Sequence, residues 1–141
     1  LLYESQVDMT LFFRNLAKLD LPNPELSVLH DAFYDDALYE SQQAAWHNWL
    51  QDYVARVNAD KPNLAQRQAL MNATNPWFVL RNYLAQQAID QANQGDYRMI
   101  MELLDASRNP YQEQPRYAAW VAKRPEWARH KAGCSMLSCS S

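Results

Sequence analysis

The scarcity of β-branched residues constrains the fold of this chain more than any other feature. Only ten of its 141 residues are Val, Ile or Thr, whereas Ala, Leu and Gln recur throughout. β-branched side chains favour strands, while Ala, Leu and Gln have good helix propensity. The sequence therefore predicts an all-α fold, and its length suits a single compact multi-helix domain with its own core.

Caps, prolines and apolar spacing predict where the helices begin and end. Asp8 is a candidate N-cap, Pro62 suits a first helical turn, and Asn75-Pro76 resembles an N-cap followed by a first helical residue. Gly95 stands where a left-handed residue closes a helix. The expected helices run from Asp8 to before Pro22, across Leu26, Leu29 and Phe33, over about 39–59, from Asp60 or Lys61 to Thr74, from Asn75 to about Gly95, from Asp96 to Asn109, and over 115–122 and 125–130.

The two ends of the chain differ in character from the middle. Beyond Gly133 the residues are small and polar, and they offer little apolar surface to offset the entropy of ordering. We therefore expect a helical domain at residues 1–131 and a flexible, cysteine-containing tail at 132–141. The chain opens on Leu1 without a capping signal, so we also expect a helix cut partway along, in a fragment of a larger protein.

Charge and cysteine usage exclude several classes of partner. The net charge is −3 and the basic residues are scattered, so a nucleic-acid partner is not expected. No apolar run approaches the roughly 20 residues that span a bilayer, so we expect no membrane partner. Both cysteines lie within the last eight residues and cannot form a disulfide framework. A reducing compartment, the cytoplasm, is the expected location.

Several kinds of catalytic site are excluded by the residues themselves. The only glycines are Gly95 and Gly133, so the chain cannot form a glycine-rich loop around phosphates. It contains no His-Arg-Asp, Asp-Phe-Gly or Gly-x-Ser-x-Gly sequence. We therefore expect no catalytic residue and no cofactor-binding residue in this chain.

A metal site is likewise not expected. His130, Cys134 and Cys139 form a His-x3-Cys-x4-Cys cluster, but structural zinc takes four ligands and this spacing is unfamiliar. His30 and His47 fall on different expected helices, and neither is a site candidate.

The remaining conspicuous residues have structural interpretations. The tryptophans recur at helical spacing with other apolar residues, which favours core packing over a ligand cage. Asp35, Asp36 and Glu40 stand near a helix start, where acids complement the helix dipole. Arg81 is expected on a helix, in an ion pair with a carboxylate or across an interface, and we favour the ion pair.

Dispersed motifs along the chain resemble the closing region of the selenoprotein O (SelO, also called YdiU) family. The resemblance rests on their order and on the C-terminal ending, because each motif alone is only a helix start, a turn or a tail. The motifs are Thr10-Leu11-Phe12-Phe13-Arg14, 75–89, Gly95-Asp96, Arg108-Asn109-Pro110-Tyr111, Glu113-Gln114-Pro115, Pro125-Glu126-Trp127-Ala128 and Ser138-Cys139-Ser140-Ser141.

This resemblance implies that the chain is part of an enzyme. Members of the family have a kinase-like, pseudokinase core and transfer AMP from ATP to Ser, Thr or Tyr hydroxyls of proteins. It follows that ATP and Mg²⁺ or Mn²⁺ would bind to a preceding N-terminal kinase-like region, which would also be the partner of this chain. The chain by itself is expected to be inactive, with a structural and regulatory role.

One functional position is implied by the same resemblance. Some eukaryotic members place selenocysteine two residues before the end, and Cys139 matches that position. Redox chemistry at Cys139 is therefore implied, with Cys134 as a weaker candidate. A disulfide partner for Cys139 could be Cys134 or a cysteine upstream, and we favour the upstream partner.

Two other interpretations remain open from the sequence. An independent helical module could bind a protein segment through an exposed aromatic face. Alternatively, Cys139 could act in a thiol oxidoreductase, although the missing Cys-x-x-Cys weighs against that activity. A region excised from a larger protein should expose a contiguous apolar patch, which distinguishes it from an independent module.

Overall fold

The computed structural model describes residues 1–131 and Cys134. The elements within this range are α-helices and 3-10 helices, and the only β pairing there is an isolated bridge between Val7 and Phe33, so the all-α prediction is confirmed. None of the helices in the described range combines the length and apolarity needed to cross a bilayer. The chain divides into two compact units, Leu1–Pro76 and Trp77–Ser141, and the domain expected at 1–131 spans both.

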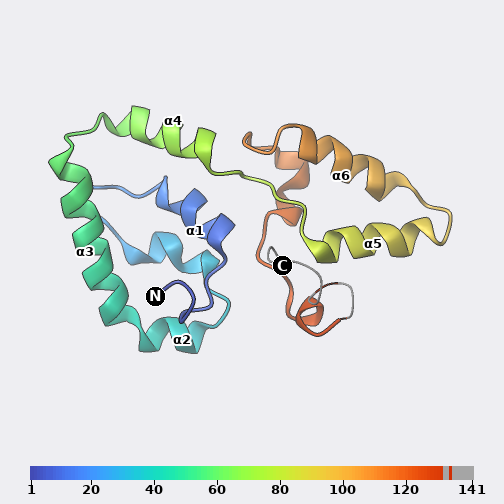
Figure 1. The fold of residues 1–141 in the computed structure, drawn as a ribbon, viewed down its shortest axis with the longest axis horizontal. Coiled ribbons are helices and arrows are strands. Elements are labelled where there is room, and N and C mark those ends of the chain that lie inside the picture. The colour runs from blue at the N-terminus through green and yellow to red at the C-terminus, as the bar shows by residue number, and fades with distance from the viewer. Residues whose placement is uncertain (132–133, 135–141) are drawn as a thin grey trace. The chain divides into compact units, whose positions relative to one another are not determined.

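The first unit is a set of helices whose starts are encoded by short-range caps. The side chains of Asp8, Asp35 and Asn63 accept hydrogen bonds from the backbone N–H three residues ahead, at 3.1, 2.9 and 3.0 Å. Asp8 therefore caps the first helix as predicted. The elements, shown in Figure 1, are α1 (Met9–Leu16), η1 (Leu26–Ala32), α2 (Asp36–Ser41), α3 (Gln43–Ala59) and α4 (Leu64–Thr74).

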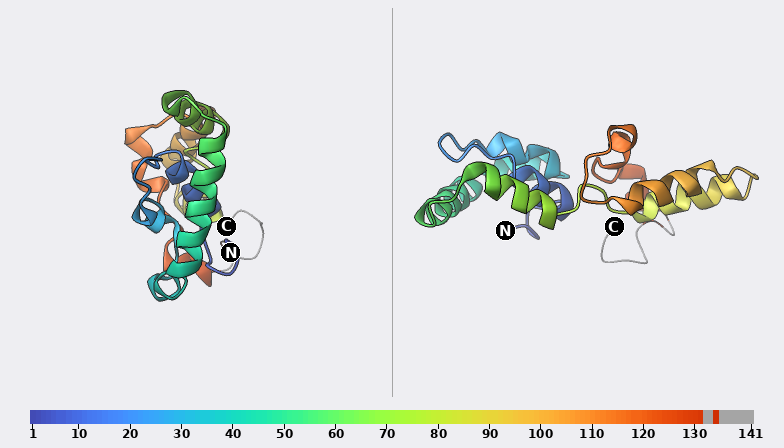
Figure 2. Two further views of the ribbon diagram at one scale, coloured as in Figure 1. Left: turned by 90° about the vertical axis from the view of Figure 1, so that its left-hand side faces the viewer. Right: turned by 90° about the horizontal axis from the view of Figure 1, so that it is seen from above.

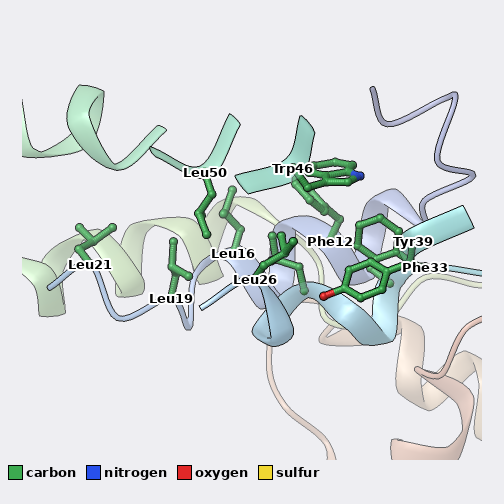
Figure 3. Packing of buried hydrophobic residues seen from close by; sticks show 11 residues of the cluster. Phe12, Leu16, Leu19, Leu21, Leu26, Phe33, Tyr39, Trp46 and Leu50 are labelled. Carbon is green, nitrogen blue, oxygen red and sulfur yellow. The ribbon is translucent and has the colours of Figure 1, made fainter. Parts of the chain in front are cut away.

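Aromatic side chains from α1, from α3 and from the end of η1 form the centre of this unit's core (Figure 3). The Trp46 ring lies 5.5 Å from that of Phe12 and 5.2 Å from that of Phe33, and all three are buried. The indole Nε1 of Trp46 donates to Ser5 Oγ at 2.9 Å. Core packing of this tryptophan is therefore confirmed, and its one polar atom has an acceptor.

Several helix boundaries in the first unit differ from the prediction. Helix α1 ends at Leu16 instead of continuing to just before Pro22. The helix expected over about 39–59 is interrupted at Gln42, whose side chain accepts a hydrogen bond from Ser5 Oγ. The helix expected from Asp60 or Lys61 begins only at Leu64, because Lys61 adopts a left-handed φ of 47° and Asn63 supplies the cap. Residues 2–6 form turns instead of the cut helix that was expected.

The second unit is built on a helical hairpin. Its elements are α5 (Asn82–Ala92), α6 (Arg98–Arg108), η2 (Pro115–Trp120) and η3 (Glu126–Arg129). Helices α5 and α6, yellow and orange, lie side by side in Figures 1 and 2. Between them Gly95 has a φ of 85°, as predicted for a left-handed residue, and Asp96 Oδ1 accepts the Arg98 N–H at 3.0 Å.

The helix predicted to begin at Pro76, with Asn75 as its N-cap, begins six residues later, at Asn82. Asn75 instead is the C-cap of α4, and its N–H donates to the Met71 carbonyl. The segment that follows is held away from helical geometry because the N–H groups of Trp77 and Phe78 both donate to the Pro110 carbonyl, at 2.7 and 2.9 Å. Hydrogen bonds to a residue distant in sequence thus prevent the helix start that Asn75-Pro76 predicted.

Candidate functional site

Cys134 lies in the core of the second unit. It is fully buried and its thiol is free. Its backbone N–H donates to the Lys131 carbonyl at 3.0 Å. The thiol had been expected on the flexible tail, and its burial means that reagents reach it only when this part of the unit opens. The other buried members of the cluster are Phe78, Tyr83, Leu84, Ala88, Met99, Leu103, Ala106, Tyr117 and Ala128.

The segment that leads to Cys134 is attached to α5 by two contacts. The Trp127 ring meets the Tyr83 ring edge to face at 5.9 Å, and Lys131 Nζ lies 5.6 Å from the Trp127 ring centre. The same ammonium group donates to Asp90 Oδ2 at 3.0 Å. These contacts hold the segment from Trp127 to Lys131 against α5. We name Trp127 and Lys131 the anchor.

The Asp90 carboxylate is held in its charged form. Gln86 Nε2 donates to its Oδ1 at 2.8 Å, and this bond, followed by that from Lys131, lowers the pKa of Asp90 below its ordinary value. The carboxylate, and with it the ion pair to Lys131, therefore persists to a lower pH than an unpaired aspartate would allow.

Cys139, the first redox candidate, lies outside the described residues. Of the His-x3-Cys-x4-Cys cluster, the structure places His130 on the surface and Cys134 in the core. In the part of the chain that the structure describes, no group of three or more His, Cys, Asp or Glu side chains could hold a metal ion.

Arg81 precedes α5 instead of lying on it. Its carbonyl accepts the N–H groups of Leu84 and Ala85, and its side chain is buried. The ion pair expected for it stays a prediction.

The other polar candidates have local structural roles. Asp35 caps α2, and Asp36 lies in the first turn of that helix. His30 contacts Asp36 at 3.3 Å and the Tyr39 ring at 4.7 Å. His47 is exposed, and its Nδ1 lies 2.8 Å from the carbonyl of residue 43 on the same helix. The two histidines therefore do not share a site.

The α5–α6 hairpin carries two hollows of opposite character. A polar hollow of about 530 Å³ is lined by charged residues of both signs, including Asp90, Arg98 and Glu102, and by Trp120. An apolar groove of about 300 Å³ is lined by Leu80, Ala85, Ala88, Ile89, Ile100, Leu103, Leu104 and Ser107. The sequence predicted that Ile100, Leu103 and Leu104 lie on one face of a helix. It did not reveal that Leu103 is buried while Ile100 and Leu104 are about half exposed.

Comparison with known proteins identifies the family. The model of the family described as "Protein adenylyltransferase SelO" matches residues 1–108, from the start of the chain to the last residue of α6. The chain belongs to the SelO family. This confirms the resemblance on which the expected enzymatic context depends.

The relatives are longer proteins. A protein of Tolumonas auensis is 56% identical over 141 residues, which are 100% of this chain and 27% of the relative. One from Azoarcus sp. strain BH72 is 54% identical over 97% of this chain and 26% of the relative, and one from Aromatoleum aromaticum is 52% identical over 100% and 27%. Each is named "Protein nucleotidyltransferase YdiU". The chain spans about a quarter of the length of these curated SelO relatives.

Proposed function

We propose that this chain is the helical C-terminal region of a protein adenylyltransferase that transfers AMP from ATP to Ser, Thr or Tyr hydroxyls of other proteins. The observation that carries the proposal is the SelO family match over residues 1–108, together with relatives named as protein nucleotidyltransferases. The parent protein works in the cytoplasm, and its protein substrates bind outside this chain.

The chemistry belongs to the rest of the parent protein. A substrate hydroxyl oxygen attacks the α-phosphorus of ATP, the bond to the β-phosphate oxygen breaks, pyrophosphate leaves, and the hydroxyl proton passes to a base or to water. ATP and Mg²⁺ or Mn²⁺ bind to the kinase-like region, since these 141 residues contain two glycines and no phosphate-cradling loop. The described helices contribute a scaffold with two apolar cores.

Regulation is proposed to reside in the last residues of the chain. Cys139 follows the buried Cys134 by five residues, so its Cα lies within about 18 Å of that of Cys134 in any conformation. A disulfide joins Cα atoms at most about 7 Å apart, which places its upstream partner within about 25 Å of Cys134. Two thiols lose two protons and two electrons to a disulfide oxidant such as oxidised glutathione, and the bridge then restrains the kinase-like region.

The first test measures AMP transfer. The parent protein and the 141-residue chain are each incubated with α-labelled ATP, a divalent cation and a protein substrate mixture, with and without reductant. We expect the parent to label protein more strongly after reduction and the 141-residue chain to label nothing. No transfer by the parent in either condition would remove the proposed activity and leave an independent binding module.

The second test separates the two cysteines. In the parent protein, Cys139→Ser should abolish the difference between oxidised and reduced samples, whereas Ser138→Ala, its neighbour, should preserve it. If only Cys134→Ala abolishes the difference between oxidised and reduced samples, the redox-sensitive thiol is that of Cys134. An unchanged redox response in Cys139→Ser would contradict the proposed role of Cys139.

A further inference from the structure

The apolar groove between α5 and α6 is a surface that the proposed function does not use. Four of its lining side chains are aliphatic and about half exposed: Leu80 at 49%, Ile89 at 50%, Ile100 at 41% and Leu104 at 47%. Apolar side chains scattered singly over a surface are ordinary, but these four line the same hollow. The groove therefore has the properties of a docking surface.

The chemistry of the lining restricts what can bind. Its one hydroxyl, on Ser107, donates to the Leu103 carbonyl at 2.7 Å, so that donor is already used. The remaining lining side chains are hydrocarbon. A charged metabolite such as a nucleotide would lose its hydration here without gaining a hydrogen bond or an ion pair. The occupant that fits is an apolar protein surface.

The size of the groove argues against a second copy of the chain. A standard protein interface uses about 20–30 residues on each side. Eight residues line the groove, fewer than a standard interface uses on one side. A segment of the same polypeptide needs no such area, because covalent connection supplies a high effective concentration.

The greater length of the relatives supplies a source for such a segment. All eight lining residues fall between 80 and 107, inside the range that the SelO family model matches. The relatives contain this chain as only 26–27% of their length, so about three quarters of the polypeptide is available to cover the groove.

We propose that the α5–α6 groove docks an apolar segment of the parent polypeptide that lies outside these 141 residues. The inference rests on the proposed function only in taking the chain as part of a larger SelO protein. It does not depend on AMP transfer.

The test measures whether the groove is covered in the full-length parent. Ile100→Cys and Leu104→Cys place thiols in the groove, and Met101→Cys is the matched control, since Met101 lies on the same helix, is 61% exposed and is not part of the lining. All three positions fall in the tryptic peptide 99–108, which contains no native cysteine. Pulse labelling with N-ethylmaleimide and mass spectrometry of this peptide therefore reports each engineered thiol separately.

We expect the thiols at 100 and 104 to react at least tenfold more slowly than the thiol at 101 in the native parent, and all three to react equally in denaturant. Equal rates in the native parent would overturn the proposal, because the groove would then be open. Protection that appears only at high protein concentration would also overturn it, by assigning the groove to a second copy. The labelling needs no ATP, so it tests the docking proposal independently of AMP transfer. If the thiols at 100 and 104 react slowly in a parent that transfers no AMP, the docking proposal is supported and the proposed activity is rejected.

Discussion

Lys131 Nζ lies 3.0 Å from Asp90 Oδ2, across 41 residues of sequence. This contact attaches the end of the described chain to α5, three residues before the buried Cys134. Trp127, on the same segment, rests its ring against Tyr83. The anchor therefore holds the segment that precedes Cys134 against α5.

Weakening the anchor should expose the Cys134 thiol. Trp127→Ala removes a large aromatic contact and should raise maleimide labelling of Cys134 about tenfold in a Cys139→Ser background. Lys131→Ala should raise it only a few-fold, because both partners of the ion pair are about half exposed. The measurement is mass spectrometry of the tryptic peptide that contains Cys134, prepared from the parent protein.

The control for this experiment is Tyr111→Ala, another half-exposed aromatic residue of the second unit, which should leave the labelling rate unchanged. If Trp127→Ala has no effect either, the anchor does not limit access to the thiol.

Arg14 should stabilise the end of α4. Its buried guanidinium donates from Nη1 to the carbonyls of Asn72 and Asn75, at 2.8 and 3.2 Å. Arg14→Met leaves these carbonyls without that donor, and charged hydrogen bonds of this kind contribute about 2 kcal/mol. Amide hydrogen exchange of α4 in the parent protein should therefore accelerate about 30-fold, since 1.4 kcal/mol corresponds to about tenfold.

Arg56→Met is the matched control for Arg14. Arg56 pairs with Asp60 on the surface, where ion pairs contribute little, so exchange in α4 should not change. Equal acceleration in both variants would show that the Arg14 bonds are not responsible.

Replacing Gly95 with Ala should destabilise the α5–α6 turn. Gly95 has a φ of 85°, and an added Cβ would meet no atom within 4 Å, so the cost arises from the backbone alone. We expect about 1–2 kcal/mol, measured as faster amide exchange in the last turn of α5. Gln94→Ala, which changes the neighbouring residue without a positive φ, should have little effect. Equal exchange in wild type and Gly95→Ala would contradict this account.

Asp96 should contribute to acid sensitivity. The side chain of Arg98 donates to its carboxylate and lowers the pKa of Asp96 from 3.8 to about 2. A depressed folded-state pKa stabilises the protein above the unfolded value, and the stabilisation is lost as the pH falls from about 4 to about 2. Urea unfolding should therefore separate wild type from Asp96→Asn above pH 4, with the difference shrinking towards pH 2. A constant difference would contradict the assignment.

The sequence predicted the features that depend on a few neighbouring residues. Asp8 caps α1, Thr74 ends α4, and Gly95 takes a positive φ, because each depends on atoms within about four residues along the chain. The helical class followed from composition for the same reason, since helix propensity is a property of individual residues.

The predicted helix boundaries were wrong where contacts between distant residues override the local helix preference. Asn75-Pro76 has the sequence of a helix start. The N–H groups of Trp77 and Phe78 nevertheless donate to the Pro110 carbonyl, and the helix begins only at Asn82. The break at Gln42 likewise accompanies a hydrogen bond from Ser5. No pattern within a short stretch of sequence could indicate that Pro110 or Ser5 would be the hydrogen-bond partner.

The features of the candidate site also separate into those that the sequence predicts and those that only the tertiary structure shows. The sequence by itself determined the helical class, the lack of a phosphate-binding loop and, through dispersed motifs, the SelO resemblance that the family match confirmed. Only the tertiary structure decided that Cys134 is buried, that Lys131 reaches Asp90, and that Ile100 and Leu104 line an open groove. Burial and long-range contacts are properties of the packed chain, because they depend on which segments meet and not on the residues next to each other in sequence.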